Sequence, residues 1–169
     1  KAISVFRVFS RRYSADFLEH SLESNPSALI FESNHPIIKK IKADPTYQKI
    51  LQKLKDKIVA NNLNGEIWPE DFMNDPAMNG KINFNSPDLV TALHGIHKIE
   101  YRVRPKGNKK FELEFVLFDI YDFEKGNVPF ILTDFKEFFK STTINRLDIG
   151  EDLGVVNNFE IEIHLKENL

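Results

Sequence analysis

Two alternating stretches joined by a turn constrain the fold of this chain more than any other feature. Within residues 96–104, His97, Ile99, Tyr101 and Val103 alternate with Lys98, Glu100, Arg102 and Arg104. The next four residues, Pro-Lys-Gly-Asn at 105–108, have the composition of a hairpin turn. A period of two is typical of strands that bury one face. We therefore predict an antiparallel hairpin with its odd-numbered residues on the buried face.

The return strand continues this pattern towards a polar end. Its odd positions are Phe111, Leu113, Phe115, Leu117, Asp119 and Tyr121. Its even positions begin polar at Glu112 and Glu114 and become apolar at Val116, Phe118 and Ile120. Apolar residues on both sides predict that the far end of this strand is buried on both faces.

The run of residues 115–123 ends in Asp119-Ile120-Tyr121-Asp122, which sets two carboxylates and a phenol within four residues. One interpretation is a core strand that runs out into a turn, where Asp is common. The other is a site that needs these oxygens, because an apolar strand rarely ends on such groups without a reason. The alternation points Asp119 and Tyr121 inward and Asp122 outward. A bulge at the strand end would let the two carboxylates converge.

The rest of the chain predicts helices first and strands later. Short helices are expected at 14–20 and 36–42, and a longer one begins at Pro45 after the capping residue Asp44 and ends at Asn64-Gly65. A final strand is expected at 159–165. This order is typical of an α+β protein, with N-terminal helices followed by a curved antiparallel sheet or a partial β-barrel.

We expect one domain, residues 1–169, in which 1–65 gives mainly helical support and 88–165 forms the β-rich catalytic part. Residues 61–88 are rich in Asn, Pro, Gly and Asp, so they are either a lid or binding loop or an irregular excursion pinned by Trp68. The lysines of residues 39–57 are typical of a solvated helix face. The chain begins with Lys1 rather than Met, which favours a piece of a longer protein.

Composition excludes several kinds of chemistry. The 169 residues include no cysteine, so disulfides, thiol catalysis and Cys-based metal sites are excluded. The net charge of −2 argues against nucleic acid as a partner. No stretch approaches the about 18 apolar residues of a membrane-spanning helix. A phosphate-binding Gly-rich loop, a zinc-binding His-x-x-x-His helix and a Gly-x-Ser-x-Gly elbow are all missing from the sequence.

The remaining candidates suit phosphoryl chemistry. Asp119 and Asp122 beside Tyr121 suit Mg²⁺, which prefers a few carboxylates together with phosphate oxygens. Such chemistry also needs a cation to balance charge on the phosphate, and Arg146 is the best placed downstream. His94 and His97 form the one close histidine pair, which either binds a metal weakly or is structural.

The sequence Asp119-Ile120-Tyr121-Asp122-Phe123 resembles the Asp-x-Tyr-Asp motif of colicin M-type bacteriocins. Three further segments are similar to the family in order: 90–95, the stretch from Arg146 to Leu153, and 159–163. The resemblance covers about residues 88–165. It implies a secreted or injected toxin that acts in the periplasm of a target bacterium, where such toxins cleave lipid II with Mg²⁺.

The resemblance also implies roles for individual residues. Asp119, Tyr121, Asp122 and Arg146 fall on catalytic positions, with Asp119 and Asp122 serving as metal ligands or general base. Tyr121 would hydrogen-bond the phosphate or maintain the site's architecture. The family's catalytic histidine corresponds to Asn145, which orients phosphate but exchanges no proton near neutral pH. His94 or His97 is then expected to supply the imidazole across the hairpin, unless the substrate is a related lipid phosphate.

We therefore predict an antibacterial toxin domain that hydrolyses a phosphoester of a lipid-linked peptidoglycan precursor. The Phe-rich segment 129–140 is either an amphipathic element that contacts the membrane surface or a core helix. A cognate immunity protein is an expected partner. The alternatives are a non-enzymatic module of the same fold that binds a lipid phosphate or a protein, and an immunity or adaptor protein.

Overall fold

The computed structural model describes residues 3, 7, 11–93, 95–108, 110–121 and 157–169. Its helices are α2 (Arg12–Ser21), α3 (Pro36–Lys42), α4 (Pro45–Val59) and α5 (Pro87–Ala92), with a 3₁₀ helix, η1, at Pro69–Phe72. Its strands are β1 (Leu29–Phe31), β2 (Asn64–Ile67), β3 (Lys98–Gly107), β4 (Lys110–Tyr121) and β5 (Phe159–Asn168). The segment 129–140 and the stretch from Arg146 to Leu153 lie outside the described residues.

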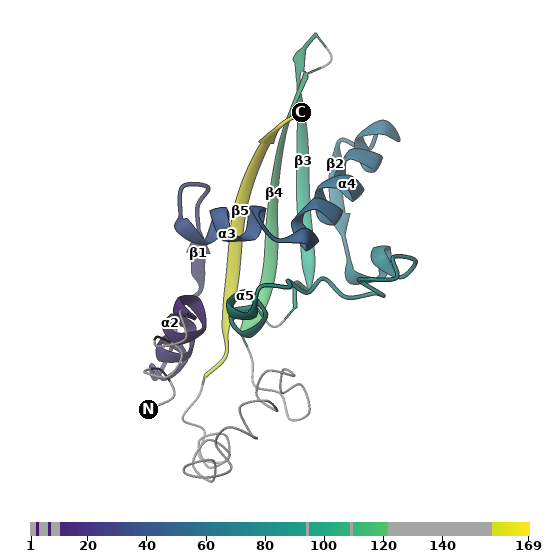
Figure 1. The fold of residues 1–169 in the computed structure, drawn as a ribbon. Coiled ribbons are helices and arrows are strands. Elements are labelled where there is room, and N and C mark those ends of the chain that lie inside the picture. Colours follow the sequence, from purple (N-terminus) through teal and green to yellow (C-terminus); the bar gives the residue numbers. More distant parts are fainter. Residues whose placement is uncertain (1–2, 4–6, 8–10, 94, 109, 122–156) are drawn as a thin grey trace.

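The strands form one open sheet in the order β1-β5-β4-β3-β2, with β4 at its centre (Figure 1). The neighbours β2 and β3, β3 and β4, and β4 and β5 are antiparallel, whereas β1 pairs with β5 in parallel, so the sheet is mixed. The four helices α2, α3, α4 and α5 precede the first long strand, β3, and contribute residues to the core that the sheet buries. The predicted α+β class is confirmed, and the sheet is open rather than closed.

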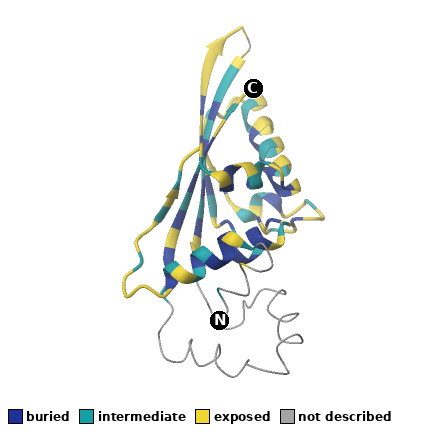
Figure 2. Ribbon diagram, turned by 60° about the vertical axis from the view of Figure 1, so that its left-hand side comes forward, coloured by how far each residue is buried: buried dark blue, intermediate teal, exposed yellow. Residues whose placement is uncertain are grey.

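The register of β4 places its odd-numbered residues in the core. Phe115 lies opposite Tyr101 on β3 and Leu165 on β5, and Leu117 lies opposite Ile99 and Ile163. All of these side chains are buried, as the alternation in the sequence predicts. They share one apolar cluster with residues of the helices, and Figure 2 shows the helices to one side of the sheet.

The opposite face of β4 differs from the prediction. Val116 and Phe118 are only half-buried, and Ile120 keeps 40% of its surface exposed. The prediction of burial on both faces is wrong because the helices that share the core cluster pack on the odd-numbered face. Even-numbered side chains are covered by neighbours on their own face, as where Lys98 Nζ lies 4.8 Å from the centroid of the Phe118 ring.

The long helix α4 begins as its sequence predicts and ends earlier. Pro45 occupies the first turn, where its missing N–H costs nothing, and the apolar stripe buries Tyr47, Ile50 and Leu54. The helix ends at Val59, and Asn64, expected to end it, instead begins β2. Because an Asn-Gly pair is typical of turns, the sequence does not predict the short edge strand that begins at Asn64.

The lysines of α4 are not simply a solvated face. The ammonium of Lys49 lies 2.6 Å from Asp75 Oδ1, and Lys53 donates to the carbonyl oxygen of Asp71 at 2.7 Å. Lys57 lies 3.6 Å from the Asp71 carboxylate. These contacts hold the segment after β2 against the helix. That segment is anchored in the core by Phe72 and Met78, whereas Trp68, the anchor expected from sequence, is 45% exposed.

Asp44 joins the start of α4 to the segment that leads into α5. Its Oδ1 accepts hydrogen bonds from Thr46 N at 3.0 Å and Asn85 Nδ2 at 3.2 Å. Its Oδ2 accepts from the backbone N–H groups of Asn85 and Ser86 at 2.9 and 2.8 Å. Burial opposes ionisation here, but these donors outweigh it and hold the pKa of Asp44 below its usual value.

We predict that Asp44→Ala lowers the free energy of unfolding by about 2–3 kcal/mol, since it removes a helix cap and leaves buried N–H groups without an acceptor. Urea denaturation followed by circular dichroism measures this change. Asp44→Asn is the matched control, because its amide oxygen still accepts and its loss should be smaller. A loss below about 0.5 kcal/mol in the alanine variant contradicts the assignment.

His35 caps α3 through an acceptor that depends on pH. Its Nδ1 accepts a hydrogen bond from Ile37 N at 3.2 Å, so this nitrogen carries no proton in the folded chain. Burial lowers the pKa of His35, and the nearby Arg12 lowers it further. The unfolded chain therefore takes up this proton more readily than the folded chain does.

We predict that His35 contributes fully to the free energy of unfolding above about pH 6.5 and that this contribution is lost as the pH falls below that value. Comparing urea midpoints at pH 7.5 and pH 5 in the native chain and in His35→Asn tests this. Asparagine caps at either pH, so the variant should lose less stability on acidification. Equal losses in both proteins contradict the prediction.

Candidate functional site

Three of the sequence-predicted site residues lie in the described part of the chain: His97, Asp119 and Tyr121. The other predicted residues, His94, Asp122, Asn145 and Arg146, lie outside it. The structure therefore describes only one part of the predicted site, which lies at the C-terminal end of β4. This end of the sheet lies near α2 and α5 in Figure 1.

The hairpin register brings His97 to Asp119. Lys98 lies opposite Phe118, and the N–H of His97 donates to the carbonyl oxygen of Phe118 at 2.9 Å. His97, one residue before Lys98, therefore projects its side chain on the same face as Asp119. Its Nε2 lies 3.6 Å from Asp119 Oδ1. This distance is within the range of an ion pair and longer than a hydrogen bond.

The two partners differ in their access to solvent. The Asp119 side chain is fully buried, whereas 53% of the His97 side chain is exposed. Asp119 Oδ1 also accepts the N–H of Ile120 at 2.9 Å, and Ile161 on β5 lies opposite Asp119. A buried carboxylate beside a half-exposed imidazole is the arrangement in which a carboxylate orients a histidine ring. The pair thus has the form of a general base with an orienting acid.

Tyr121 belongs to an aromatic cluster at this end of the sheet. Its ring stacks on Phe159 with centroids 5.0 Å apart and meets Phe17 of α2 edge-on at 6.0 Å. Only 2% of Tyr121 is exposed, and burial raises the pKa of its phenol far above the usual value, so it stays protonated. Of the two roles predicted for Tyr121, these contacts favour site architecture.

The predicted Mg²⁺ site rests on Asp119 and Asp122, of which only Asp119 is described. Its buried side chain presents no exposed oxygen to a hydrated ion in this arrangement. Among the described residues, no group of three or more histidines and carboxylates is placed to hold a metal ion. The metal therefore remains a prediction.

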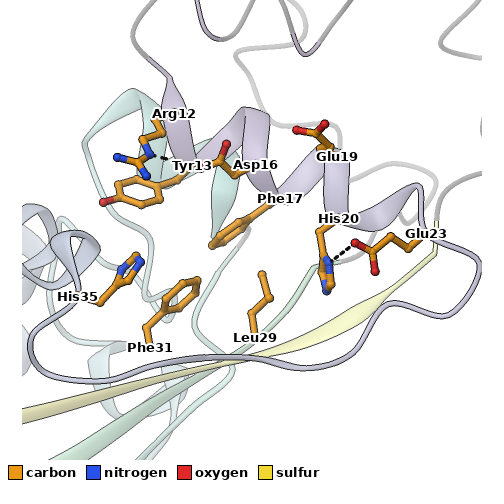
Figure 3. Close-up of a pocket in the computed structure, with 10 residues that line it drawn as sticks. All are labelled: Arg12, Tyr13, Asp16, Phe17, Glu19, His20, Glu23, Leu29, Phe31 and His35. Carbon is orange, nitrogen blue, oxygen red and sulfur yellow. Dashed lines mark hydrogen bonds and ion pairs between the residues drawn. The ribbon is translucent and has the colours of Figure 1, made fainter.

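A cleft beside α2 was not found from the sequence. Its volume is about 350 Å³, and its lining includes Tyr13, Phe17, Asp16 and Glu19 of α2 together with Phe31 of β1 (Figure 3). The spacing of two aromatic residues at i and i+4 beside two acidic residues at i and i+3 is the signal that could have revealed it. We call this feature the α2 cleft.

Comparisons of the chain with models of protein families, with curated proteins and with solved structures find no match. The likeness to the colicin M-type family therefore rests on the residues quoted above and remains a prediction. None of the helices in the described ranges is long and apolar enough to cross a membrane.

We predict that Tyr121→Ala lowers the free energy of unfolding by about 3–5 kcal/mol, because it empties a buried aromatic position. Tyr121→Phe keeps the ring contacts and should lose about 1 kcal/mol. Thermal and urea denaturation of both variants provide the comparison. A stable alanine variant would show that Tyr121 is not part of the core.

Proposed function

We propose that this chain is a hydrolase domain whose general base is His97, oriented by Asp119. The observation that carries the proposal is the 3.6 Å approach of a half-exposed imidazole to a fully buried carboxylate. Both groups sit where the Asp-x-Tyr-Asp motif leaves the sheet. An imidazole at this place also supplies the proton acceptor that Asn145 lacks.

The proposed reaction is hydrolysis of a phosphoester. With Nε2 turned to Asp119, the Nδ1 atom of His97 accepts a proton from a water molecule as the water oxygen attacks phosphorus. The Asp119 carboxylate stabilises the imidazolium that forms. The bond from phosphorus to the leaving oxygen then breaks, and that oxygen takes up the proton from the imidazolium, which returns His97 to its neutral form. Arg146 and Asn145 are proposed to bind the phosphate, and Asp122 would hold Mg²⁺. Mg²⁺, where bound, would neutralise charge on the phosphate oxygens.

The proposed substrate is a lipid-linked peptidoglycan precursor, and the proposed setting is the periplasm of a bacterium attacked by a toxin that carries this domain. The support for this step is the motif resemblance alone. Membrane-surface contact through 129–140 and a cognate immunity protein belong to the same proposal.

A non-enzymatic binding module is the second candidate. The observation that favours it is the complete burial of the Asp119 side chain and the core position of Tyr121. Two of the motif's three functional groups would then serve the fold. An experiment on the imidazole separates the two candidates, because a binding module has no step that needs a base.

We predict that His97→Gln reduces hydrolysis of a lipid-linked pyrophosphoryl sugar by about 100-fold or more, since it removes the general base. Release of the water-soluble pyrophosphorylated sugar is the readout, with Mg²⁺ present and after its removal by a chelator. Loss of activity on chelation and its recovery when Mg²⁺ is added support a role for the metal.

His164→Gln is the matched control, because His164 of β5, like His97 just before β3, lies beside a carboxylate. Its Nε2 lies 3.1 Å from Glu162 Oε2, but on the opposite face of the sheet. This variant should keep full activity. Equal activity of the native chain and His97→Gln, or a fall in both variants, contradicts the proposed role of His97.

Asp119→Asn tests the orienting role, provided that thermal denaturation shows a folded variant. We expect a lower rate and a changed dependence of the rate on pH, because the amide no longer stabilises imidazolium. Expression in the periplasm and in the cytoplasm tests the setting. Lysis from the periplasm alone supports the toxin, and no effect in either compartment favours the binding module.

A further inference from the structure

The α2 cleft has apolar walls made by three elements. Phe17 projects from α2, Leu29 and Phe31 come from β1, and His35 precedes α3, and these side chains face one another across the cleft in Figure 3. The rings of Phe17 and Phe31 are stacked with centroids 5.7 Å apart, and those of Phe31 and His35 are 4.6 Å apart. Leu29 and Phe31 are half-buried and offer apolar surface to a ligand, whereas Phe17 is only 2% exposed and packs behind Phe31.

The rim of the cleft is acidic. Asp16, Glu19 and Glu23 line it together with Arg12, whose Nε lies 3.5 Å from Asp16 Oδ2. Glu23 is engaged by His20, whose Nδ1 lies 3.0 Å from Glu23 Oε1. Asp16 and Glu19 lie one turn apart on α2, where side chains three residues apart are neighbours on the helix surface.

The rim already holds a guanidinium group. Arg7 Nη2 lies 2.7 Å from Glu19 Oε2 and 3.8 Å from Asp16 Oδ1. A planar guanidinium and a carboxylate make strong, directional pairs, which an ammonium does not reproduce. Because burial and Arg12 lower the pKa of His35, that ring adds no positive charge to the cleft at neutral pH.

We propose that the α2 cleft binds the side chain of an arginine residue in a basic peptide. The guanidinium would lie between Asp16 and Glu19, and the aliphatic stem would lie against Leu29 and Phe31. Arg7, from the chain's own N-terminal part, is the internal competitor for this position. The inference stands apart from the proposed hydrolase, since it assigns no role to His97 or Asp119.

The probe is N-acetyl-arginine methylamide, and its norleucine counterpart supplies a stem of similar length without charge. Titration into the whole chain, followed by the backbone amide signals of α2 and β1 in NMR spectra, measures binding. We expect the arginine probe to bind and the norleucine probe to bind at least about tenfold more weakly, because only the former forms charged hydrogen bonds.

Two variants separate this site from general attraction between charges. Glu19→Gln should weaken binding about tenfold, and Arg7→Ala should strengthen it about two- to fivefold by removing an exposed competing ion pair. Glu70→Gln, an exposed carboxylate of η1, is the control and should change nothing. Both Arg7 and Glu19 are more than half exposed, so the variants should fold.

Three outcomes overturn the inference: equal binding of the two probes, unchanged binding in Glu19→Gln, or weaker binding in Arg7→Ala. Phe31→Leu adds a test of the aromatic wall. It keeps apolar volume while removing the ring face, and it should weaken the arginine probe more than the norleucine probe. Equal weakening of both probes would overturn the contribution assigned to this ring.

Discussion

The register of β4 between β3 and β5 is the constraint on which the rest of the structure depends. Every odd-numbered residue from Leu113 to Tyr121 faces the core, and each has a partner on β5. A slip of one residue would turn the whole set to the opposite face, where no described helix covers it. The same register sets His97 beside Asp119. Packing and the candidate chemistry therefore share one origin.

Polar groups at the core boundary fix how the helices meet the sheet. Asp44 gathers four donors from two segments, and Asp88 accepts from Ser14 while its second oxygen lies 2.7 Å from Lys40 Nζ. Tyr47 donates to Glu167 on the last strand. Asp44 and Asp88 are each held by partners distant in sequence, so each favours one arrangement of elements. Hydrophobic burial alone would tolerate several arrangements.

The sequence predicts the parts of the fold whose signals are local. Period-two alternation gives the hairpin and the inward direction of Asp119, and Pro36 and Pro45 at first-turn positions give the starts of α3 and α4. The covered side of the sheet depends on where helices pack, so the burial of Ile120 was predicted wrongly. Strand β2 was missed because Asn64-Gly65 has the composition of a turn. The lysines of α4 find partners that are close only after folding.

In the candidate site too, local sequence signals predict some features and packing sets the others. The inward direction of Asp119 is read directly from alternation, while its nearness to His97 depends on hairpin register, which the turn and the two strands set together. From the sequence, His97 was one of two histidines, with His94, that were expected to supply the imidazole. The α2 cleft was not predicted because its walls come from three elements that pack together only in the folded chain.

The parallel pairing of β1 with β5 has a consequence for how this chain reaches its fold. Leu29, Ile30 and Phe31 lie opposite Ile161, Glu162 and Ile163, so an edge of the sheet joins the first fifth of the chain to its last residues. During synthesis α2 and β1 emerge long before their strand partner does. Such distant pairing slows folding, because loop entropy is lost before the contacts form. The aromatic residues around Phe17 therefore stay accessible to water, or to a chaperone, until the last strand has left the ribosome.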